Sequence, residues 1–343
     1  MGVQIRDIVA RKKTRLQYLS GKSVAIDAHN TLYQFLSIIR SFDGRPLMDG
    51  AGHVTSHLSG LLYRTMNFIK LGIKPVYVFD GKPPVLKKRE IARRIDVKKK
   101  AEKKYRKALS EGRLEDARMY SQATARLTNF MVEDSKRLLV LMGIPWIQAP
   151  SEGEAQIAYM ASSGKVWAAA SQDYDALLFG ASRLVRNIAI SGRRKLPRKK
   201  VYVEVEPEII ELEQMLKKLD ISLEQLVVLA ILVGTDFNPN GIKGIGSKRA
   251  LSLVRKHRTF EAVMKQFDDS LFPVDPQEIM DIFLKPKVTT DYHLSWQTPD
   301  LEGVVTFLCD ERDFSEKRVR STIEKMAVAF EKQEKKTSLD KWF

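Results

Sequence analysis

The sequence has little cysteine and little histidine. Cys309 is the only cysteine, so neither an intrachain disulfide nor a cysteine zinc site can form. Any metal ion must therefore be held by oxygen or histidine ligands. Of the five histidines, only His53 and His57 have the i,i+4 spacing of a ligand pair, and no acidic residue follows them in the pattern of a zinc protease. We predict that both lie on a helix surface and bind no metal.

Long apolar runs and excess negative charge are also absent. No stretch is long enough to span a bilayer, and no basic helix has a clean apolar face, so membrane attachment is not expected. The start, residues 1–6, lacks an apolar signal core, and Arg6 stands where a myristoylation signal needs Ser or Thr, which predicts an intracellular protein. The net charge is +16, which favours a polyanionic partner, above all nucleic acid. The length suits one large domain or two of ordinary size.

Several short apolar runs end in an acidic residue and are followed by turn residues or a helical pattern; one of them, the strand predicted at 23–27, leads into a helical stretch at 32–40. This order is typical of an α/β fold with a mostly parallel sheet. Loops at the carboxyl ends of parallel strands meet in one crevice, so seven carboxylates could lie together. They are Asp27, Asp80, Glu152, Glu154, Asp173, Asp175 and Asp236. Any one of them alone is more often a cap or turn residue, but their recurrence at successive strand ends favours a site.

Carboxylates without histidine or cysteine match the preference of magnesium for oxygen ligands. Two magnesium ions about 3.5–4 Å apart would neutralise a phosphodiester and activate a water for its hydrolysis. Seven carboxylates exceed the charge of two such ions, so nearby cations are required. Lys87 and Arg94, about two helical turns apart, could reach the scissile phosphate. Without metal, we expect the clustered carboxylates to repel one another and to have raised pKa values.

Two basic runs separate these acidic segments. Residues 82–107 hold thirteen basic and three acidic residues in a helical composition. The pairs Glu90–Arg94 and Glu102–Arg106 have the spacing that supports an exposed helix, and a solvated helix face is the simple interpretation. Most of the positive charge nevertheless stays unpaired, which favours contact with a phosphate backbone. A second run, residues 193–200, precedes the alternating strand predicted at 201–205 and is a second candidate contact.

A glycine-rich segment, residues 241–248, lies between two predicted helices at 226–233 and 249–256. Glycines let the backbone turn tightly and offer N–H groups to a phosphate, and two lysines add charge. The residues concerned are Gly241, Lys243, Gly244, Gly246 and Lys248. The spacing fits neither a Walker loop nor a dinucleotide fingerprint. A helix–hairpin–helix contact with duplex DNA is therefore predicted.

The charged carboxyl-terminal stretch ends in Trp342 and Phe343. Exposed aromatic residues on a polar tail are typical anchors for a partner protein. Docking of the tail onto its own domain is the alternative.

In combination and order, these motifs resemble the flap endonucleases of the Rad2/XPG superfamily, in particular the archaeal form. The resemblance covers nearly the whole chain and rests on residues 1–3, 26–28, 78–84, 149–156, 171–175, 234–237 and 241–246. It implies a PIN-like nuclease fold in a single domain, 1–328. Within it would lie an N-terminal region (1–98), a helical arch (within 82–130) and an internal region (116–258, including a helix–hairpin–helix at 226–256). A tail, 329–343, would follow.

The resemblance also implies roles for individual residues. The seven carboxylates would ligate two magnesium ions, for which manganese could substitute, and Lys87 and Arg94 would act on the scissile phosphate. The arch would thread a 5′ single strand, to which Lys82 would contribute a contact. Tyr33 would stack on the nucleotide at the cleavage point, and Arg40 would lie near the DNA junction. The glycine hairpin would grip downstream duplex, often with a potassium ion.

The implied activity is hydrolysis at 5′ flaps, with 5′–3′ exonuclease activity, in Okazaki-fragment maturation and DNA repair. The tail resembles the box that binds the sliding clamp, proliferating cell nuclear antigen, through Lys336, Leu339, Trp342 and Phe343. Lys336 stands where the box usually has Gln, so we expect weaker binding. A 5′ exonuclease, a junction resolvase and a non-catalytic junction-binding scaffold remain as alternatives. A monomer in an archaeal cytoplasm is expected, or in a nucleus if the source is eukaryotic.

Overall fold

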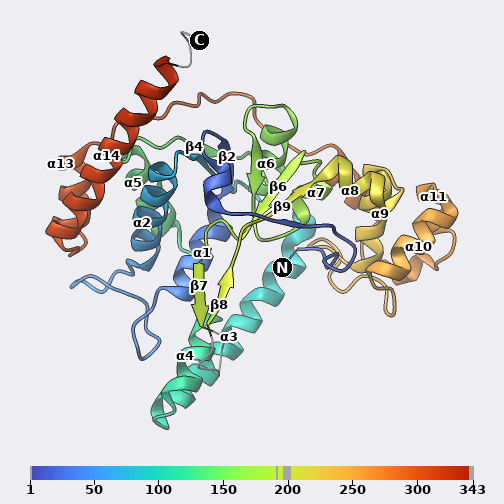
Figure 1. Cartoon of the computed structure of the whole chain (residues 1–343). Coiled ribbons are helices and arrows are strands. Elements are labelled where there is room, and N and C mark those ends of the chain that lie inside the picture. Colours follow the sequence, from blue (N-terminus) through green and yellow to red (C-terminus); the bar gives the residue numbers. More distant parts are fainter. Residues whose placement is uncertain (1, 191, 196–201, 340–343) are drawn as a thin grey trace.

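The computed structural model describes residues 2–190, 192–195 and 202–339. Its centre is a seven-stranded sheet with the strand order β1-β9-β6-β5-β2-β3-β4 (Figure 1). The five strands from β6 to β4 run parallel, β9 pairs antiparallel with β6, and β1 pairs antiparallel with β9. The strands are β1 (Lys12–Lys13), β2 (Ser23–Asp27), β3 (Lys74–Phe79), β4 (Trp146–Gln148), β5 (Ala168–Ala170), β6 (Arg183–Arg186) and β9 (Glu208–Glu211). The predicted α/β architecture with a mostly parallel sheet is confirmed.

Helices cover both faces of the sheet, and each face has its own apolar core. Side chains alternate between faces along a strand, so Ala25 of β2 enters one core while Val24 and Ile26 enter the other. The first core lies under α6 (Gly153–Ser162), α7 (Asp175–Leu178), α8 (Leu212–Leu219), α9 (Leu223–Val233), α10 (Ser247–His257), α11 (Phe260–Met264) and α12 (Pro276–Leu284). The second lies under α1 (Ala28–Ile38), α2 (Ser56–Lys70), α5 (Asn129–Leu141), α13 (Leu301–Val305) and α14 (Glu316–Leu339).

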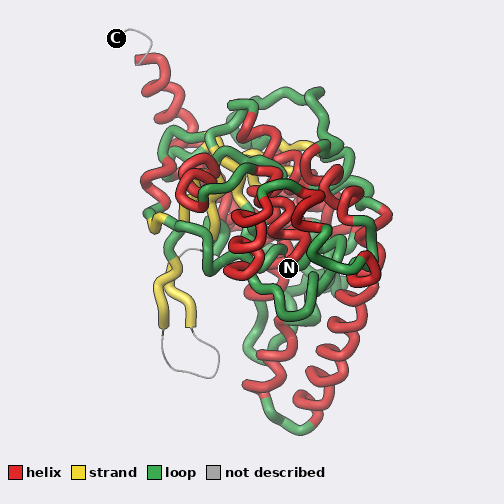
Figure 2. The backbone as a smooth tube through the Cα atoms, turned by 90° about the vertical axis from the view of Figure 1, so that its right-hand side faces the viewer, coloured by secondary structure: helices red, strands yellow, loops and turns green. Residues whose placement is uncertain are grey.

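Two elements project from this body. Helices α3 (Lys88–Ser110) and α4 (Leu114–Gln122) pack on each other and extend away from the sheet, as Figures 1 and 2 show. Strands β7 (Gly192–Lys195) and β8 (Tyr202–Val205) form a separate antiparallel hairpin. The helix predicted in the basic segment is thus present. The Glu102–Arg106 pair forms as predicted, at 2.6 Å.

Capping side chains explain why two helices begin earlier than their apolar patterns suggested. The first helix was predicted from Leu32, but α1 begins at Ala28 because the Asp27 carboxylate caps it and accepts the Asn30 N–H at 2.9 Å. Helix α9 begins at Leu223, since Ser222 and Gln225 form a reciprocal capping box. Both caps lie before the first apolar residue of the pattern.

The prediction that His53 and His57 both lie on a helix surface was wrong, above all for His57. It lies on α2 but is fully buried, and neither ring nitrogen has a hydrogen-bond partner within the described part of the chain. Burial, together with Arg312, lowers the pKa of His57 to about 3. His53 precedes α2 and pairs with Asp49 at 3.0 Å. The i,i+4 spacing alone could not distinguish a surface from a core position.

Helix α14 lies along α2, and the Gln333 side chain donates to the Ile69 carbonyl at 2.6 Å. The first part of the predicted clamp-binding box, through Leu339, falls at the end of α14. Its aromatic residues, Trp342 and Phe343, lie outside the described residues. In the described chain, no helix is both long enough and apolar enough to cross a membrane.

Candidate functional site

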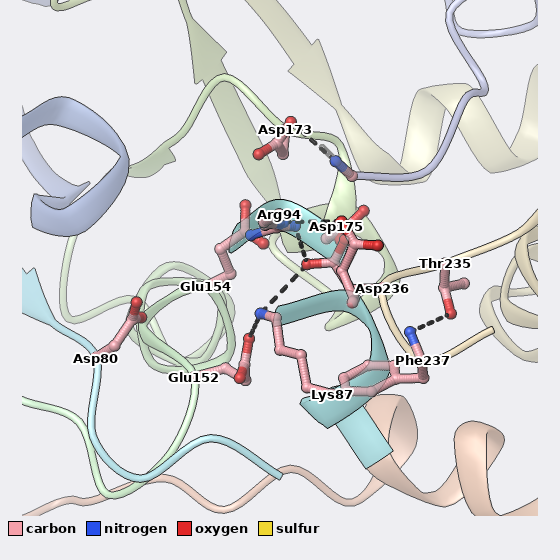
Figure 3. Close-up of polar contacts among 12 residues, drawn as sticks. Asp80, Lys87, Arg94, Glu152, Glu154, Asp173, Asp175, Thr235, Asp236 and Phe237 are labelled. Atoms are coloured by element: carbon pink, nitrogen blue, oxygen red, sulfur yellow. Dashed lines mark hydrogen bonds and ion pairs between the residues drawn. The ribbon is translucent and has the colours of Figure 1, made fainter. Parts of the chain in front are cut away.

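A cavity of about 570 Å³ lies at the carboxyl ends of the parallel strands. Its lining includes six of the seven predicted carboxylates: Asp27, Asp80, Glu152, Glu154, Asp173 and Asp236. Asp175 lies behind this lining, 4% exposed, and its Oδ1 accepts the Val3 N–H at 2.7 Å. Figure 3 shows side chains from the start of α3, from α6 and from the loops after β3, β5 and α9 converging there. We call this cavity the acidic pocket.

Strand ends and helix starts position the first carboxylates. Asp80 follows β3, and its Oδ1 accepts the Gly153 N–H at 2.6 Å. A Cβ atom at Gly153 would lie 2.7 Å from that oxygen, so only glycine allows this approach. Glu154 lies in the first turn of α6, where the positive end of the helix dipole favours a carboxylate. It accepts a hydrogen bond from the Ser171 hydroxyl at 2.8 Å.

The amino-terminal segment completes the other side of the pocket. The Gly2 N–H donates to Asp173 Oδ1 and the Asn30 amide donates to Asp173 Oδ2, both at 3.1 Å. A Cβ atom at Gly2 would lie 2.5 Å from Asp175 Oδ1. The first residues of the chain therefore order a loop that is about 170 positions away in sequence.

Two cations from the base of the basic helix enter the pocket (Figure 3). The Lys87 ammonium contacts the Glu152 carboxylate and lies 3.3 Å from Asp236 Oδ2. The Arg94 guanidinium lies 2.6 Å from the same Asp236 oxygen, and its Nε donates to Glu90 at 2.8 Å. Burial lowers the pKa of both cations, but the neighbouring carboxylates outweigh this and raise it overall. Both groups therefore remain charged in the pocket.

Burial and mutual repulsion raise the pKa values of the innermost carboxyls. Burial is the largest cause at Asp27 and Glu154, followed by the charges of Asp80 and Asp175 respectively. Burial and the charge of Asp236 raise the pKa of Asp175 to about 7. Burial also raises the pKa of Glu152, although Lys87 opposes it. The repulsion expected from the sequence is thus present, and it favours the binding of cations.

The donor set of the pocket fits magnesium, because its acidic ligands offer only carboxylate oxygens. Among the described residues, however, no three acidic or histidine side chains close around one point as a ready-made metal cage. Lys87 and Arg94 lie between Glu152 and Asp236 instead. Metal binding would therefore require these ion pairs to rearrange.

Models of the XPG N-terminal domain and the XPG I-region match residues 1–101 and 143–236, respectively. Flap endonuclease 1 of Pyrococcus furiosus is 55% identical over 343 residues, which cover all of this chain and 99% of the relative. The one from Staphylothermus marinus is 51% identical, with full coverage of both chains. The solved structure of flap endonuclease-1 from Methanococcus jannaschii is 44% identical and superposes with a TM-score of 0.77, covering 97% of this chain and 100% of that one.

The chain belongs to the flap endonuclease family. The resemblance seen in its motifs is thereby confirmed, and the family comprises structure-specific nucleases that are generally metal-dependent. The catalytic core of Rad2 in complex with DNA substrate has a TM-score of 0.70 at 24% identity and covers 95% of this chain and 100% of that one. At that identity the match supports the fold alone.

The residues that the flap endonuclease resemblance assigns to DNA lie in three places. Tyr33 lines the acidic pocket, and the Lys98 ammonium lies 4.4 Å from its ring centroid. Arg40 lies just beyond α1 and donates to the carbonyl of Leu36 in α1 and to that of Gly44 in the following loop. Lys82 is exposed between β3 and α3. Of these residues, only Tyr33 belongs to the pocket.

The glycine hairpin lies between α9 and α10 (Figure 1), and none of its residues 241–248 lines the pocket. Gly241 and Gly244 have positive φ angles of 52° and 83°, a region that favours glycine. Gly246 is the N-cap of α10, so the hairpin leads directly to a helix amino terminus. Lys243 and Lys248 are exposed beside it. This is the arrangement expected of a backbone phosphate contact.

Sequence reasoning missed several polar residues of the pocket. His29 and Asn30 follow Asp27 on α1 and line the pocket, and their positions next to the first aspartate were the available signal. Glu90 was interpreted as half of an exposed ion pair. It is instead only 1% exposed and binds both Arg93 and Arg94. Its burial depends on the base of α3 lying against the pocket, which helical spacing does not reveal.

Proposed function

We propose that this chain hydrolyses one phosphodiester near the junction of a 5′-flapped duplex, using two magnesium ions held by the seven carboxylates. The observation that carries the proposal is the convergence of six carboxylates in one pocket whose wall includes Lys87 and Arg94. No neutral ligand or soft metal would need so much oxygen-based negative charge. A bound phosphate backbone would explain why Lys87 and Arg94 lie beside this negative charge.

When bound, magnesium would neutralise the carboxylates and lower the pKa of the attacking water. The chain's own residues then have distinct tasks. Glu152 and Asp236 would help to hold the metal ions, and Lys87 and Arg94, which now pair with them, would bind oxygens of the scissile phosphate. Glu90 keeps its hydrogen bond to Arg94 Nε and so holds the guanidinium at the base of α3. Tyr33 stacks on the base at the cleavage point, supported by Lys98.

The projecting elements select the branched substrate in this proposal. Helix α3, whose base lines the pocket, presents exposed lysines to a 5′ single strand, and α4 packs against it. The glycine hairpin binds the duplex backbone on the other side, and its carbonyl oxygens are candidate ligands of a potassium ion. Lys82 and Arg40 contact DNA between these two regions.

The tail serves as the attachment to a sliding clamp of the proliferating cell nuclear antigen type. Lys336, Leu339, Trp342 and Phe343 are the proposed contact residues. Deleting residues 338–343 should abolish clamp binding and leave the cleavage of free flaps intact. Unchanged clamp affinity after the deletion rejects this attachment.

Cleavage of a labelled double-flap DNA tests the proposed function. Wild-type protein should cut near the junction with magnesium and stop cutting when the metal is chelated. Asp173→Asn keeps the shape of the side chain, so it should still bind the junction but not cut it. If wild type binds the junction but never cuts with magnesium or manganese, the chain is a binding scaffold. Cutting only from free 5′ ends or at four-way junctions identifies an exonuclease or a resolvase.

A further inference from the structure

His29 lies next to Asp80 in the acidic pocket. Of the five histidines, all within the described residues, it alone lines this cavity. It is on the first turn of α1, two residues after Asp27, while Asp80 directly follows strand β3. The family-derived roles described above assign no role to this side chain.

The geometry defines which ring nitrogen carries the proton. His29 Nδ1 accepts the backbone N–H of Asp80 at 3.1 Å and lies 3.6 Å from Asp80 Oδ2, beyond hydrogen-bond distance. Accepting at Nδ1 requires a free lone pair, so the neutral ring carries its proton on Nε2. The ring also packs edge-on against Phe79, with centroids 5.9 Å apart. Strand β3 thus holds the ring and the ring holds the residue that follows the strand.

Asp80 is fixed at three of its four polar atoms. Its N–H donates to His29, its carbonyl accepts the Gln148 amide at 2.7 Å, and its Oδ1 accepts the Gly153 N–H at 2.6 Å. This leaves Oδ2 for a ligand. The Asp80 side chain is 42% exposed, compared with 11% for Glu152 and 10% for Asp236. Because burial does not restrain Asp80, its hydrogen bonds must set the direction of Oδ2.

We propose that His29 is a positioning residue that, through the Asp80 main chain, aims Asp80 Oδ2 at a bound magnesium ion. The inference rests on the proposed function, in which Asp80 is a metal ligand. Groups that orient ligating side chains typically contribute about 10–100-fold to metal affinity or activity. His29 lacks the carboxylate charge of its neighbours. It therefore acts by orienting Asp80 and not by attracting the metal ion.

Two substitutions separate the acceptor from the rest of the ring. The amide oxygen of His29→Asn can take the place of Nδ1, whereas His29→Leu keeps the bulk and removes the acceptor. Binding of Mn²⁺ to the DNA-free protein, followed by electron paramagnetic resonance, gives a readout that does not depend on activity. Single-turnover cleavage against magnesium concentration gives a second. His53→Leu is the matched control, because His53 also pairs with an aspartate but lies outside the pocket.

His29→Leu should weaken Mn²⁺ binding and raise the magnesium concentration for half-maximal cleavage, each by about tenfold. His29→Asn should stay within about threefold of wild type, and His53→Leu should not change Mn²⁺ affinity. If His29→Leu does not fold, His29→Ala provides the same comparison. Mn²⁺ binding by the Leu variant equal to that of wild type overturns the proposal, and so does an Asn variant as impaired as the Leu variant.

Asp80→Ala separates this inference from the proposed function. Wild-type cleavage and Mn²⁺ binding by Asp80→Ala would reject the metal site itself. If Asp80→Ala loses both while His29→Leu keeps both, the metal site stands and the role of His29 is rejected.

Discussion

The acidic pocket and the basic helix α3 both concentrate charge of one sign, but they hold it differently. In the pocket the side chains of Glu152 and Asp236 are 11% and 10% exposed. Along α3 the side chains of Lys100 and Arg106 are 74% and 77% exposed. Charge inside the pocket is held in fixed geometry with little water, so each group interacts strongly with its neighbours. Charge on the helix is screened by salt and is largely interchangeable.

The two regions meet at the base of α3. Lys87 and Arg94 belong to the basic segment by sequence, but their side chains are only 16% and 38% exposed and contact pocket carboxylates. The position of a cation along this basic segment therefore determines its role. Cations at the base of α3 can act on the scissile phosphate, and those further along can only attract DNA. Substitutions of the pocket carboxylates should abolish cleavage, and substitutions further along the helix should only weaken binding.

The largest effect is expected for Glu154→Gln. The change keeps the volume but removes a buried charge, so cleavage should fall by about a thousandfold or more. The metal-free protein should become more stable, because a repelling charge is gone. Single-turnover cleavage and the thermal midpoint in chelator measure the two effects. Glu302→Gln, at an exposed ion pair with Arg320, is the control. Normal cleavage by Glu154→Gln would show that a single pocket carboxylate can be lost without effect, as is expected for a single lysine of the helix.

A smaller loss is expected for Arg94→Ala, about 100-fold in the single-turnover rate, because it removes a preorganised cation from the scissile phosphate. Arg93→Ala is the matched control, since Arg93 shares Glu90 with Arg94, whereas Arg94 also forms an ion pair with Asp236. It should lose no more than about threefold. Equal losses for the two variants would contradict the claim that, at the base of α3, Arg94 acts on the scissile phosphate while Arg93 does not.

The pH dependence of stability should distinguish the pocket from the helix. The pKa of Asp175 is raised from 3.8 to about 7, and those of Asp27 and Glu154 are also raised. The folded metal-free protein then binds more protons than the unfolded chain, so its stability falls as pH rises from about 4 to 7. Magnesium displaces these protons, and the magnesium-induced rise in thermal midpoint should be larger at about pH 8 than at about pH 5. A rise independent of pH contradicts this account.

The smallest effect is expected on the exposed part of α3. The double change Lys99→Gln and Lys103→Gln should weaken flap binding a few-fold at low salt without changing the single-turnover rate at saturating protein. Each lost phosphate contact lowers the slope of log affinity against log salt by about 0.7–0.9. Lys325→Gln with Lys332→Gln, two exposed residues on α14, removes the same charge elsewhere. If the slope of log affinity against log salt is unchanged in the α3 variant, these lysines do not contact DNA.

Local sequence patterns predicted the sheet and the convergence of the acidic residues. Strand β2 has the predicted bounds, and the acidic pocket lies at the predicted end of the sheet. These features follow from periodicity and from the geometry of parallel strands. The contacts of Gly2 with Asp173 and of His29 with Asp80 could not be predicted in the same way. Each joins segments far apart in sequence, at distances set by how separate elements pack.

The burial of His57 and Glu90 shows the same limit. Each lies at a helical position whose spacing suits an exposed side chain, yet the surrounding helices or the pocket cover it. Periodicity identifies the apolar face of a helix, but it does not show which polar position a second element will cover.

Anomalous diffraction from crystals grown with manganese tests the central claim most directly, because it locates bound ions independently of activity. The account predicts two peaks in the acidic pocket about 3.5–4 Å apart, with Asp236 and Glu152 turned from Arg94 and Lys87 toward the ions. Wild-type crystals with no peak in the pocket, or with peaks only at other acidic clusters, would contradict a two-metal nuclease site.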